Sequence, residues 1–267
     1  MQVNKLNFAF WGTPDVASET LSILKQAGYT PSLIVTSPDR PQGRKMLVTP
    51  PPVKVWAKKN DIPYTQSENP DVSAFDLSIV VAYGKIIAEK TLDAPRLGSL
   101  NIHYSLLPKW RGASPVESAI LHGDMETGVS IQKMKFKLDS GPIVAQKKAD
   151  ILPYETAPEL RKRLIGIGGE LLVEILPDFA SGKIKEILQD ESEATYSKKI
   201  KKEDGLIDLS DNGEKNYRKF LAYDGWPRTF FFKDGKRIIV AGARLENGKF
   251  IIEKIIPEGG KEVEYRN

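Results

Sequence analysis

LSIVVA at residues 77–82 is an almost unbroken apolar run. A strand with one face in water alternates apolar and polar residues, whereas a strand buried on both faces reads as a continuous apolar run. Strands of the second kind form parallel sheets that helices cover on both sides. The run therefore predicts a buried strand of an α/β fold.

Strand-like and helix-like segments alternate on both sides of this run. Residues 6–10 and 32–36 are predicted strands, and between them a helix is predicted to begin at Pro14, with Thr13 as its cap, and to stop at Gly28. Further helices are predicted over residues 53–59, 115–122 and 156–180, and further strands over residues 100–107, 129–134 and 143–151. This alternation predicts a Rossmann-like, mostly parallel sheet.

The pattern changes after residue 190, where a charged segment poor in apolar residues reads as a linker. Beyond it we predict a helix over residues 214–222, followed by short strands over residues 229–232, 237–241 and 250–256. Asp234-Gly235 and Asn247-Gly248 are hairpin turn signals between these strands. The sequence thus predicts a first domain over residues 1–189, a linker over 190–203 and a small β domain over 204–267.

Composition excludes several kinds of site. The chain of 267 residues contains no cysteine and two histidines, which excludes disulfides and thiolate chemistry and argues against a metal site. No apolar run reaches the ~18 residues that a membrane span needs, and the polar N-terminus lacks the layout of a signal peptide. We expect a cytoplasmic protein with no metal and no membrane partner.

The net charge of +4 is concentrated in the C-terminal quarter of the chain. Residues 198–267 hold 16 Lys/Arg and 12 Asp/Glu, so this segment accounts for the whole excess. A basic domain can attract a phosphate backbone, although a solvated basic surface would give the same count.

Residues 99–112, SLNIHYSLLPKWRG, carry the strongest chemical signal. Side chains alternate along a strand, so Asn101 and His103 point to the same face, at the C-terminal end of a predicted strand where open α/β folds place their sites. They pair a neutral hydrogen-bond donor with an imidazole that can carry protons. Asp139 lies in a predicted turn and can orient a histidine. Spacing alone also permits an ordinary strand-edge histidine and a turn aspartate.

The same stretch resembles the hallmark of the folate-dependent formyltransferases, in which an Asn-x-His pair precedes a Ser-Leu-Leu-Pro turn. The similarity continues through GASPVESAILHGDMETGVSIQKMKFKLDSGPIVAQ at residues 112–146, and includes FWGTPD at 10–15, SPDRPQGRKMLVTPPPVK at 37–54 and VVAYG at 80–84. Within the family, these motifs look like those of the members whose acceptor is methionyl initiator tRNA. The resemblance covers about residues 7–207.

The resemblance implies a role for each matching residue. Asn101, His103 and Asp139 match the catalytic trio. The implied formyl donor is 10-formyltetrahydrofolate, with no metal, and the positions matching its contacts are Ser105, Leu106, Leu107 and Pro108, together with Val81, Tyr83 and Gly84. The implied partner is methionyl initiator tRNA, met by a loop that contains Arg40, Arg44 and Lys45. The C-terminal domain would be a shortened, OB-like barrel that helps to hold the tRNA, and the protein would act as a monomer.

Two other functions remain open at this point. Val16 stands where the tRNA-specific members usually carry an aromatic residue, and enzymes that formylate an amino sugar on a nucleotide share the Asn-x-His and Ser-Leu-Leu-Pro motifs. The proline-flanked basic loop at residues 39–54 argues for tRNA over the sugar. A non-catalytic RNA-binding protein on the same scaffold is the other alternative, and the presence of Asn101, His103 and Asp139 argues against it.

Overall fold

The computed structural model describes residues 6–43 and 46–266 of the chain. The chain falls into two compact units, each assembled from three stretches of sequence. The first unit consists of Met1–Arg111, Gly128–Lys148 and Lys162–Ala194, and the second of Gly112–Thr127, Ala149–Arg161 and Thr195–Asn267. Because the units interleave along the sequence, the predicted domain division at residues 189 and 204 stays a prediction.

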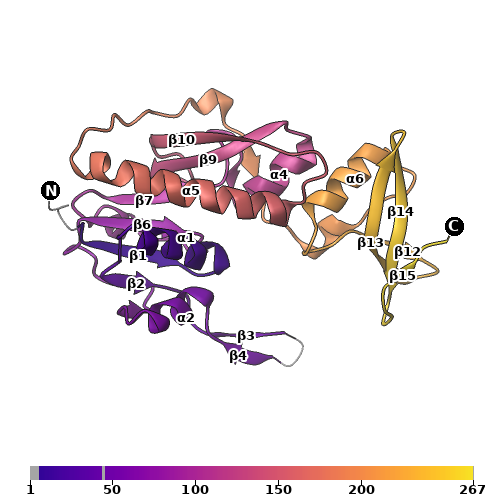
Figure 1. Cartoon of the computed structure of the whole chain (residues 1–267), viewed down its shortest axis with the longest axis horizontal. Helices are drawn as coiled ribbons and strands as arrows, with labels where there is room; N and C mark the ends of the chain where they lie inside the picture. Colours follow the sequence, from indigo (N-terminus) through magenta and orange to yellow (C-terminus); the bar gives the residue numbers. More distant parts are fainter. Residues whose placement is uncertain (1–5, 44–45, 267) are drawn as a thin grey trace. The chain divides into compact units, whose positions relative to one another are not determined.

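The apolar run at residues 77–82 supplies β6, Leu77–Val81, which is the central strand of a seven-stranded sheet (Figure 1). All five residues of β6 are buried. The strand lies between β1, Phe8–Gly12, and β7, Ser99–His103, and it is parallel to both. Burial on both faces explains the missing alternation of polar residues, as the sequence predicted.

The remaining strands extend this sheet to the order β10-β9-β7-β6-β1-β2-β5. On one side, β2, Leu33–Val35, and β5, Tyr64–Thr65, continue the parallel arrangement. On the other side, β9, Glu126–Lys133, runs antiparallel to β7, and β10, Ile143–Asp150, forms the edge. The predicted α/β fold with a mostly parallel sheet is confirmed.

Helices and buried loops cover the two faces of this sheet. The helices of this part of the chain are α1, Asp15–Gln26, α2, Pro52–Lys59, the single turn α3, Glu89–Leu92, and α5, Ala157–Ala180. Gly168 of α5 lies against Ile102 of β7, and Gly169 lies against Ile23 of α1. On the opposite face, Trp11 and its neighbours form an apolar cluster; its buried members are Ala9, Trp11, Val35, Val72, Val80, Tyr83, Ile87 and Leu92.

The start of α1 differs from the sequence prediction. The helix begins at Asp15 with Pro14 as its N-cap residue, and no side chain caps it. The hydroxyl of Thr13 instead donates to the carbonyl of Tyr83 at 2.9 Å and pairs with the hydroxyl of Ser37 at 3.0 Å. The predicted Thr13 cap is therefore wrong, because this hydroxyl bridges β-strand ends that are distant in sequence.

The proline-flanked basic loop at residues 39–54 contains a small hairpin. Its strands are β3, Arg40–Gln42, and β4, Leu47–Thr49, which pair antiparallel. Met46, Leu47 and Val48 each expose more than 60% of their surface. The hairpin thus presents apolar side chains to solvent.

The second unit contains the predicted C-terminal β domain. Its four-stranded antiparallel sheet consists of β12, Phe230–Lys233, β13, Lys236–Glu246, β14, Lys249–Pro257, and β15, Val263–Glu264. The two predicted turns join β12 to β13 and β13 to β14, with positive φ at Asp234, Gly235, Asn247 and Gly248 as such hairpin turns require. The helices α4, Pro115–His122, and α6, Gly213–Ala222, belong to the same unit.

The core of this β domain lies on one face of the sheet. It is built from Ile207, Phe231, Ile238 and Val240, with Phe220 of α6 packed against them. The antiparallel sheet is consistent with the small barrel-like domain that the sequence predicted.

The segment predicted as a linker carries short ordered elements. These are the 3₁₀ turns η1, Glu191–Glu193, and η2, Lys202–Gly205, and the strand β11, Tyr196–Ser197. The two-residue strand β8, Arg111–Gly112, completes the set of strands that the structure describes. Across the two ranges that the structure describes, no helix is both long and apolar enough to cross a bilayer.

Candidate active site

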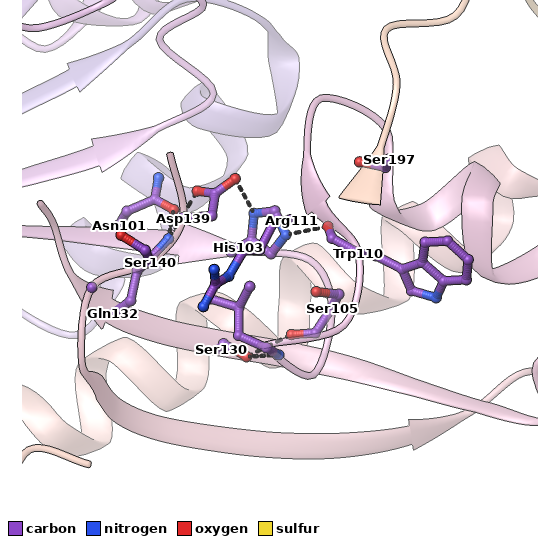
Figure 2. A network of polar contacts seen from close by, with 12 residues as sticks. Asn101, His103, Ser105, Trp110, Arg111, Ser130, Gln132, Asp139, Ser140 and Ser197 are labelled. Atoms are coloured by element: carbon purple, nitrogen blue, oxygen red, sulfur yellow. Dashed lines mark hydrogen bonds and ion pairs between the residues drawn. The ribbon is translucent and has the colours of Figure 1, made fainter. Parts of the chain in front are cut away.

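The C-terminal end of β7 brings Asn101 and His103 to the edge of the sheet (Figure 2). Asn101 is opposite Val80 of β6, and its Nδ2 donates to the Val80 carbonyl at 3.0 Å. His103 exposes 6% of its surface. An amide and an imidazole are thus held side by side, as their spacing on a strand predicted.

Both ring nitrogens of His103 face acceptors. Nε2 donates to the carbonyl oxygen of Trp110 at 2.9 Å, because a carbonyl can only accept. Nδ1 lies 3.7 Å from Oδ2 of Asp139, which is within the range of an ion pair and longer than a hydrogen bond. The structure therefore brings Asn101, His103 and Asp139 together, and it adds the Trp110 carbonyl as a partner that the sequence did not reveal.

Asp139 lies in a tight turn that follows β9. Its backbone is left-handed, with φ of 47°. A side-chain amide holds this turn, since Nε2 of Gln189 donates to the carbonyls of Asp139 at 2.9 Å and of Gly141 at 2.6 Å. The carboxylate is consequently positioned by a residue fifty places further along the chain.

Arg111 anchors the segment that carries Gln189. The Arg111 side chain is fully buried, and its guanidinium donates to Oε1 of Gln189 at 2.8 and 3.1 Å and to both carboxylate oxygens of Glu191 at 2.9 and 3.1 Å. Nζ of Lys137 reaches the same carboxylate at 2.6 Å. Hydrogen bonds from Arg111 and Lys137 lower the pKa of Glu191 to about 2.

We predict that Glu191→Gln lowers the urea midpoint of unfolding at pH 7. A depressed pKa in the folded state stabilises the protein above the ordinary value near 4.5, and this stabilisation is lost as the pH falls towards about 2. The difference in midpoint between wild type and variant should therefore shrink from pH 7 to pH 3. The difference should be modest, because the Glu191 side chain is 54% exposed and solvent screens the pair. A difference in urea midpoint that stays constant or increases towards pH 3 would contradict the lowered pKa of Glu191.

Gln132 joins Asn101 and Asp139, and no sequence motif singled it out. It lies on β9 opposite Asn101 and exposes 2% of its surface. Its Nε2 is 2.9 Å from Oδ1 of Asp139 and 3.4 Å from Oδ1 of Asn101. A single glutamine in a strand is not a sequence signal for a functional site. Its position beside Asn101 follows only from the pairing of β9 with β7.

The turn at residues 105–108 follows directly after β7. The strand predicted over residues 100–107 ends at His103, because the hydroxyl of Ser130 holds the next residues in a turn. Oγ of Ser130 accepts from the amide of Leu107 at 2.9 Å and donates to the carbonyl of Ser105 at 2.6 Å. Nε2 of Gln146 donates to the carbonyl of Leu107 at 2.8 Å. The folate-contact candidates Ser105, Leu106, Leu107 and Pro108 thus form one braced turn beside His103.

The other folate-contact candidates follow the neighbouring strand. Val81 ends β6, and Gly84 has φ of 78° in the loop beyond it. The Tyr83 side chain is buried edge-on against Trp11, with ring centroids 5.3 Å apart, and burial raises the pKa of its hydroxyl. Only the backbone of Tyr83 is therefore available to a ligand.

A cavity of about 320 Å³ opens beside these residues. It is lined by, among others, Thr13, Ser37, Arg40, Tyr83, Gly84 and Lys85. Arg40, one of the three tRNA-contact candidates, is exposed at the start of β3. The other two, Arg44 and Lys45, lie outside the described residues. Among the residues that the structure does describe, no His, Asp or Glu side chains group in a way that could hold a metal ion.

Two family models match the chain. The model described as formyl transferase matches residues 5–176, and the model described as formyl transferase, C-terminal domain, matches residues 199–264. The methionyl-tRNA formyltransferase of Thermotoga maritima is 44% identical over 231 residues, which are 83% of this chain and 74% of that protein.

Solved structures share the fold at low sequence identity. A methionyl-tRNA formyltransferase from Clostridium thermocellum superposes with a TM-score of 0.62 at 18% identity, covering 97% of this chain and all of that one. An N-formyltransferase from Helicobacter canadensis, in complex with folinic acid and dTDP-3-aminofucose, superposes with a TM-score of 0.71 at 16% identity, covering 98% of this chain and all of that one. At these identities the likeness establishes the architecture alone.

Proposed function

Because the chain belongs to the formyl transferase family, we propose that it transfers the formyl group of 10-formyltetrahydrofolate to the amino group of methionyl initiator tRNA, for translation initiation. The sequence similarity to the methionyl-tRNA formyltransferase of Thermotoga maritima favours the tRNA over an amino sugar nucleotide as the acceptor. The similarity in fold to the N-formyltransferase from Helicobacter canadensis does not bear on the choice of acceptor, because the two chains are only 16% identical.

The observation that supports this chemistry most is the chain of contacts from Asn101 through Gln132 and Asp139 to His103. It gathers an amide donor, a carboxylate and an imidazole at one edge of the sheet, where open α/β folds bind their ligands. We assign the catalytic roles to Asn101, His103 and Asp139 on this basis.

The reaction requires charge stabilisation and one proton transfer. The amine nitrogen attacks the formyl carbon, the carbonyl oxygen gains charge, and the bond from that carbon to the folate nitrogen then breaks. One Nδ2 hydrogen of Asn101 is used by the Val80 carbonyl, which leaves the second to donate to the developing oxyanion. A donor of this kind contributes about 10²- to 10³-fold to the rate.

His103 carries the proton in this proposal. The amine loses one proton and the departing folate nitrogen gains one, so a single group that accepts and then donates balances the reaction. Nε2 is committed to the Trp110 carbonyl, which leaves Nδ1, beside Asp139, as the exchanging nitrogen. Asp139 stabilises the ring while it holds the extra proton.

The substrates are assigned to surfaces of both units. The turn at residues 105–108 and the backbone of Val81, Tyr83 and Gly84 would hold the folate, and the cavity with Arg40 would receive the acceptor, helped by Arg44 and Lys45. The exposed lysines at positions 198, 199, 201 and 202 would add contacts to tRNA phosphates. We place the chemistry in residues 1–189 and tRNA binding partly in residues 204–267, in a monomer acting in the cytoplasm.

The choice of acceptor is tested by presenting 10-formyltetrahydrofolate with either methionyl initiator tRNA or a dTDP-linked amino sugar. We expect formyl-methionine from the first and no product from the second. Arg40→Gln should lower kcat/KM for the tRNA, leave the KM for folate unchanged and reduce the dependence on salt, since each phosphate contact contributes at most about 0.9 to the log–log slope.

Lys59→Gln serves as the matched control, because it removes an exposed cation at the end of α2 without altering the cavity. Efficient formylation of the sugar, together with tRNA kinetics that neither salt nor Arg40→Gln affects, would replace the tRNA assignment with the sugar assignment.

A further inference from the structure

Gln132 contacts both Asn101 and Asp139 through a single atom. Its Nε2 is 2.9 Å from Oδ1 of Asp139 and 3.4 Å from Oδ1 of Asn101. Both neighbours are acceptors, so the two hydrogens of the Gln132 amide satisfy them together. Oε1 of the same side chain is buried with no hydrogen-bond partner, so the polar contacts of this amide run through Nε2.

The contacts with Gln132 determine how the Asn101 amide and the Asp139 carboxylate are oriented. With Oδ1 turned to Gln132, Asn101 directs Nδ2 to the Val80 carbonyl and keeps one hydrogen for another acceptor. With Oδ1 bound by Gln132, Asp139 directs Oδ2 towards Nδ1 of His103. A flipped Asn101 amide would turn a carbonyl oxygen to the place where a donor is required.

We propose that Gln132 is a positioning residue of the formyl transfer site, which orients the Asn101 amide and the Asp139 carboxylate at once. The inference rests on the proposed function of these two residues. Gln132 exchanges no proton and forms no bond to substrate; it acts by holding the donor and the carboxylate in the orientations that the reaction uses. A displacement of about 1 Å at such a centre costs up to about 10²-fold in rate.

The charged surroundings of Gln132 determine how its replacement by glutamate behaves. Asp139 is in direct contact with it, and His103 contacts Asp139. Lys137, Glu191 and Arg111 lie further out, in the network that holds the Asp139 turn. A carboxylate at position 132 would thus face Asp139 at hydrogen-bond distance, and two carboxylates so close cannot both stay ionised without strong repulsion.

Two variants of nearly the same size as glutamine test whether Gln132 acts by orienting Asn101 and Asp139 or only by filling space. Gln132→Met removes the amide and should lower kcat about 10- to 100-fold, with the KM for both substrates within about threefold and the shape of the pH profile unchanged. Gln132→Glu can share a proton with Asp139 only at low pH, so its kcat relative to wild type should rise at least about tenfold from pH 8.5 to pH 6.

Gln66→Glu is the matched control, because Gln66 also donates to a carboxylate, Asp39, at 3.0 Å. Its kcat relative to wild type should stay constant across the same pH range. The inference is overturned if Gln132→Met retains kcat within about twofold, or if Gln132→Glu gives a pH-independent ratio to wild type.

A second readout does not depend on turnover. The chain has two histidines, so ¹⁵N-histidine spectra resolve His103 once His122→Asn has assigned the other signal. In Gln132→Met the His103 ring signals should move from their wild-type positions at the same pH, because the Asp139 carboxylate beside Nδ1 is no longer held by Gln132, whereas Gln66→Glu should leave them in place. Unchanged His103 signals in Gln132→Met overturn the inference. Inactivity of the wild type towards tRNA would instead overturn the proposed function, so the two failures are distinguishable.

Discussion

His103→Ala is expected to lower the rate of formyl transfer about 10²- to 10⁴-fold, the range typical of losing a general acid–base group. The variant removes the ring that lies between the Trp110 carbonyl and Asp139. The measurement is single-turnover formation of formyl-methionyl-tRNA at saturating folate. The KM for folate should change little, because the assigned folate contacts lie on the turn at residues 105–108 and after β6.

His122→Ala is the matched control for this substitution. His122 is the last residue of α4, and its Nδ1 bonds to the carbonyl of Ser118 within the same helix at 2.9 Å. We expect its rate to remain within about twofold of wild type, since surface substitutions away from a site have small effects. Near-normal turnover in a folded His103→Ala protein would remove this residue from the mechanism.

Gly141→Ala is expected to lower the free energy of unfolding by at least about 2 kcal/mol. A Cβ at position 141 would lie 1.8 Å from the carbonyl oxygen of Lys133, which is backbone at the end of β9 and cannot rotate away. The Asp139 turn would have to move, so formyl transfer should fall as well. Urea denaturation at pH 7 measures the first effect, and single-turnover assays of the folded fraction measure the second.

Gly166→Ala supplies the comparison, because a Cβ at this position of α5 meets no atom within 4 Å. It should raise the stability by about 0.5–1 kcal/mol, as expected when alanine replaces glycine inside a helix. If Gly141→Ala proves as stable as Gly166→Ala, then the Asp139 turn does not pack closely against the backbone of β9.

Local patterns predicted the elements of this fold well. The apolar run at residues 77–82 indicated the central strand of the sheet, and the Asp-Gly and Asn-Gly pairs indicated both hairpin turns of the β domain. Two-residue spacing on β7 indicated that Asn101 and His103 share a face. Each of these signals depends on the backbone conformation of neighbouring residues, which sequence spacing encodes directly.

Contacts between distant segments were not accessible in this way. Thr13 has the residue type and position of a helix cap, yet the Tyr83 carbonyl competes for its hydroxyl and binds it. Arg111 and Gln132 lie inside stretches that resemble family motifs, and Gln189 lies outside them, but no sequence signal marks the role of any of the three. Strand pairing and the segment after α5 bring them to the site. The short strand β15 escaped notice because both of its residues are exposed.

The central claim is that one site, at the C-terminal end of β7, moves the formyl group from folate to methionyl-tRNA. The most direct measurement is a single-turnover reaction with formyl-labelled 10-formyltetrahydrofolate and methionyl initiator tRNA, quenched over time and assayed for both products. We predict that each mole of label lost from folate appears as one mole of formyl-methionine, and that the triple variant Asn101→Ala, His103→Ala, Asp139→Ala forms none above the uncatalysed background. Label that leaves folate without reaching methionine, or transfer that persists in the triple variant, would contradict the claim.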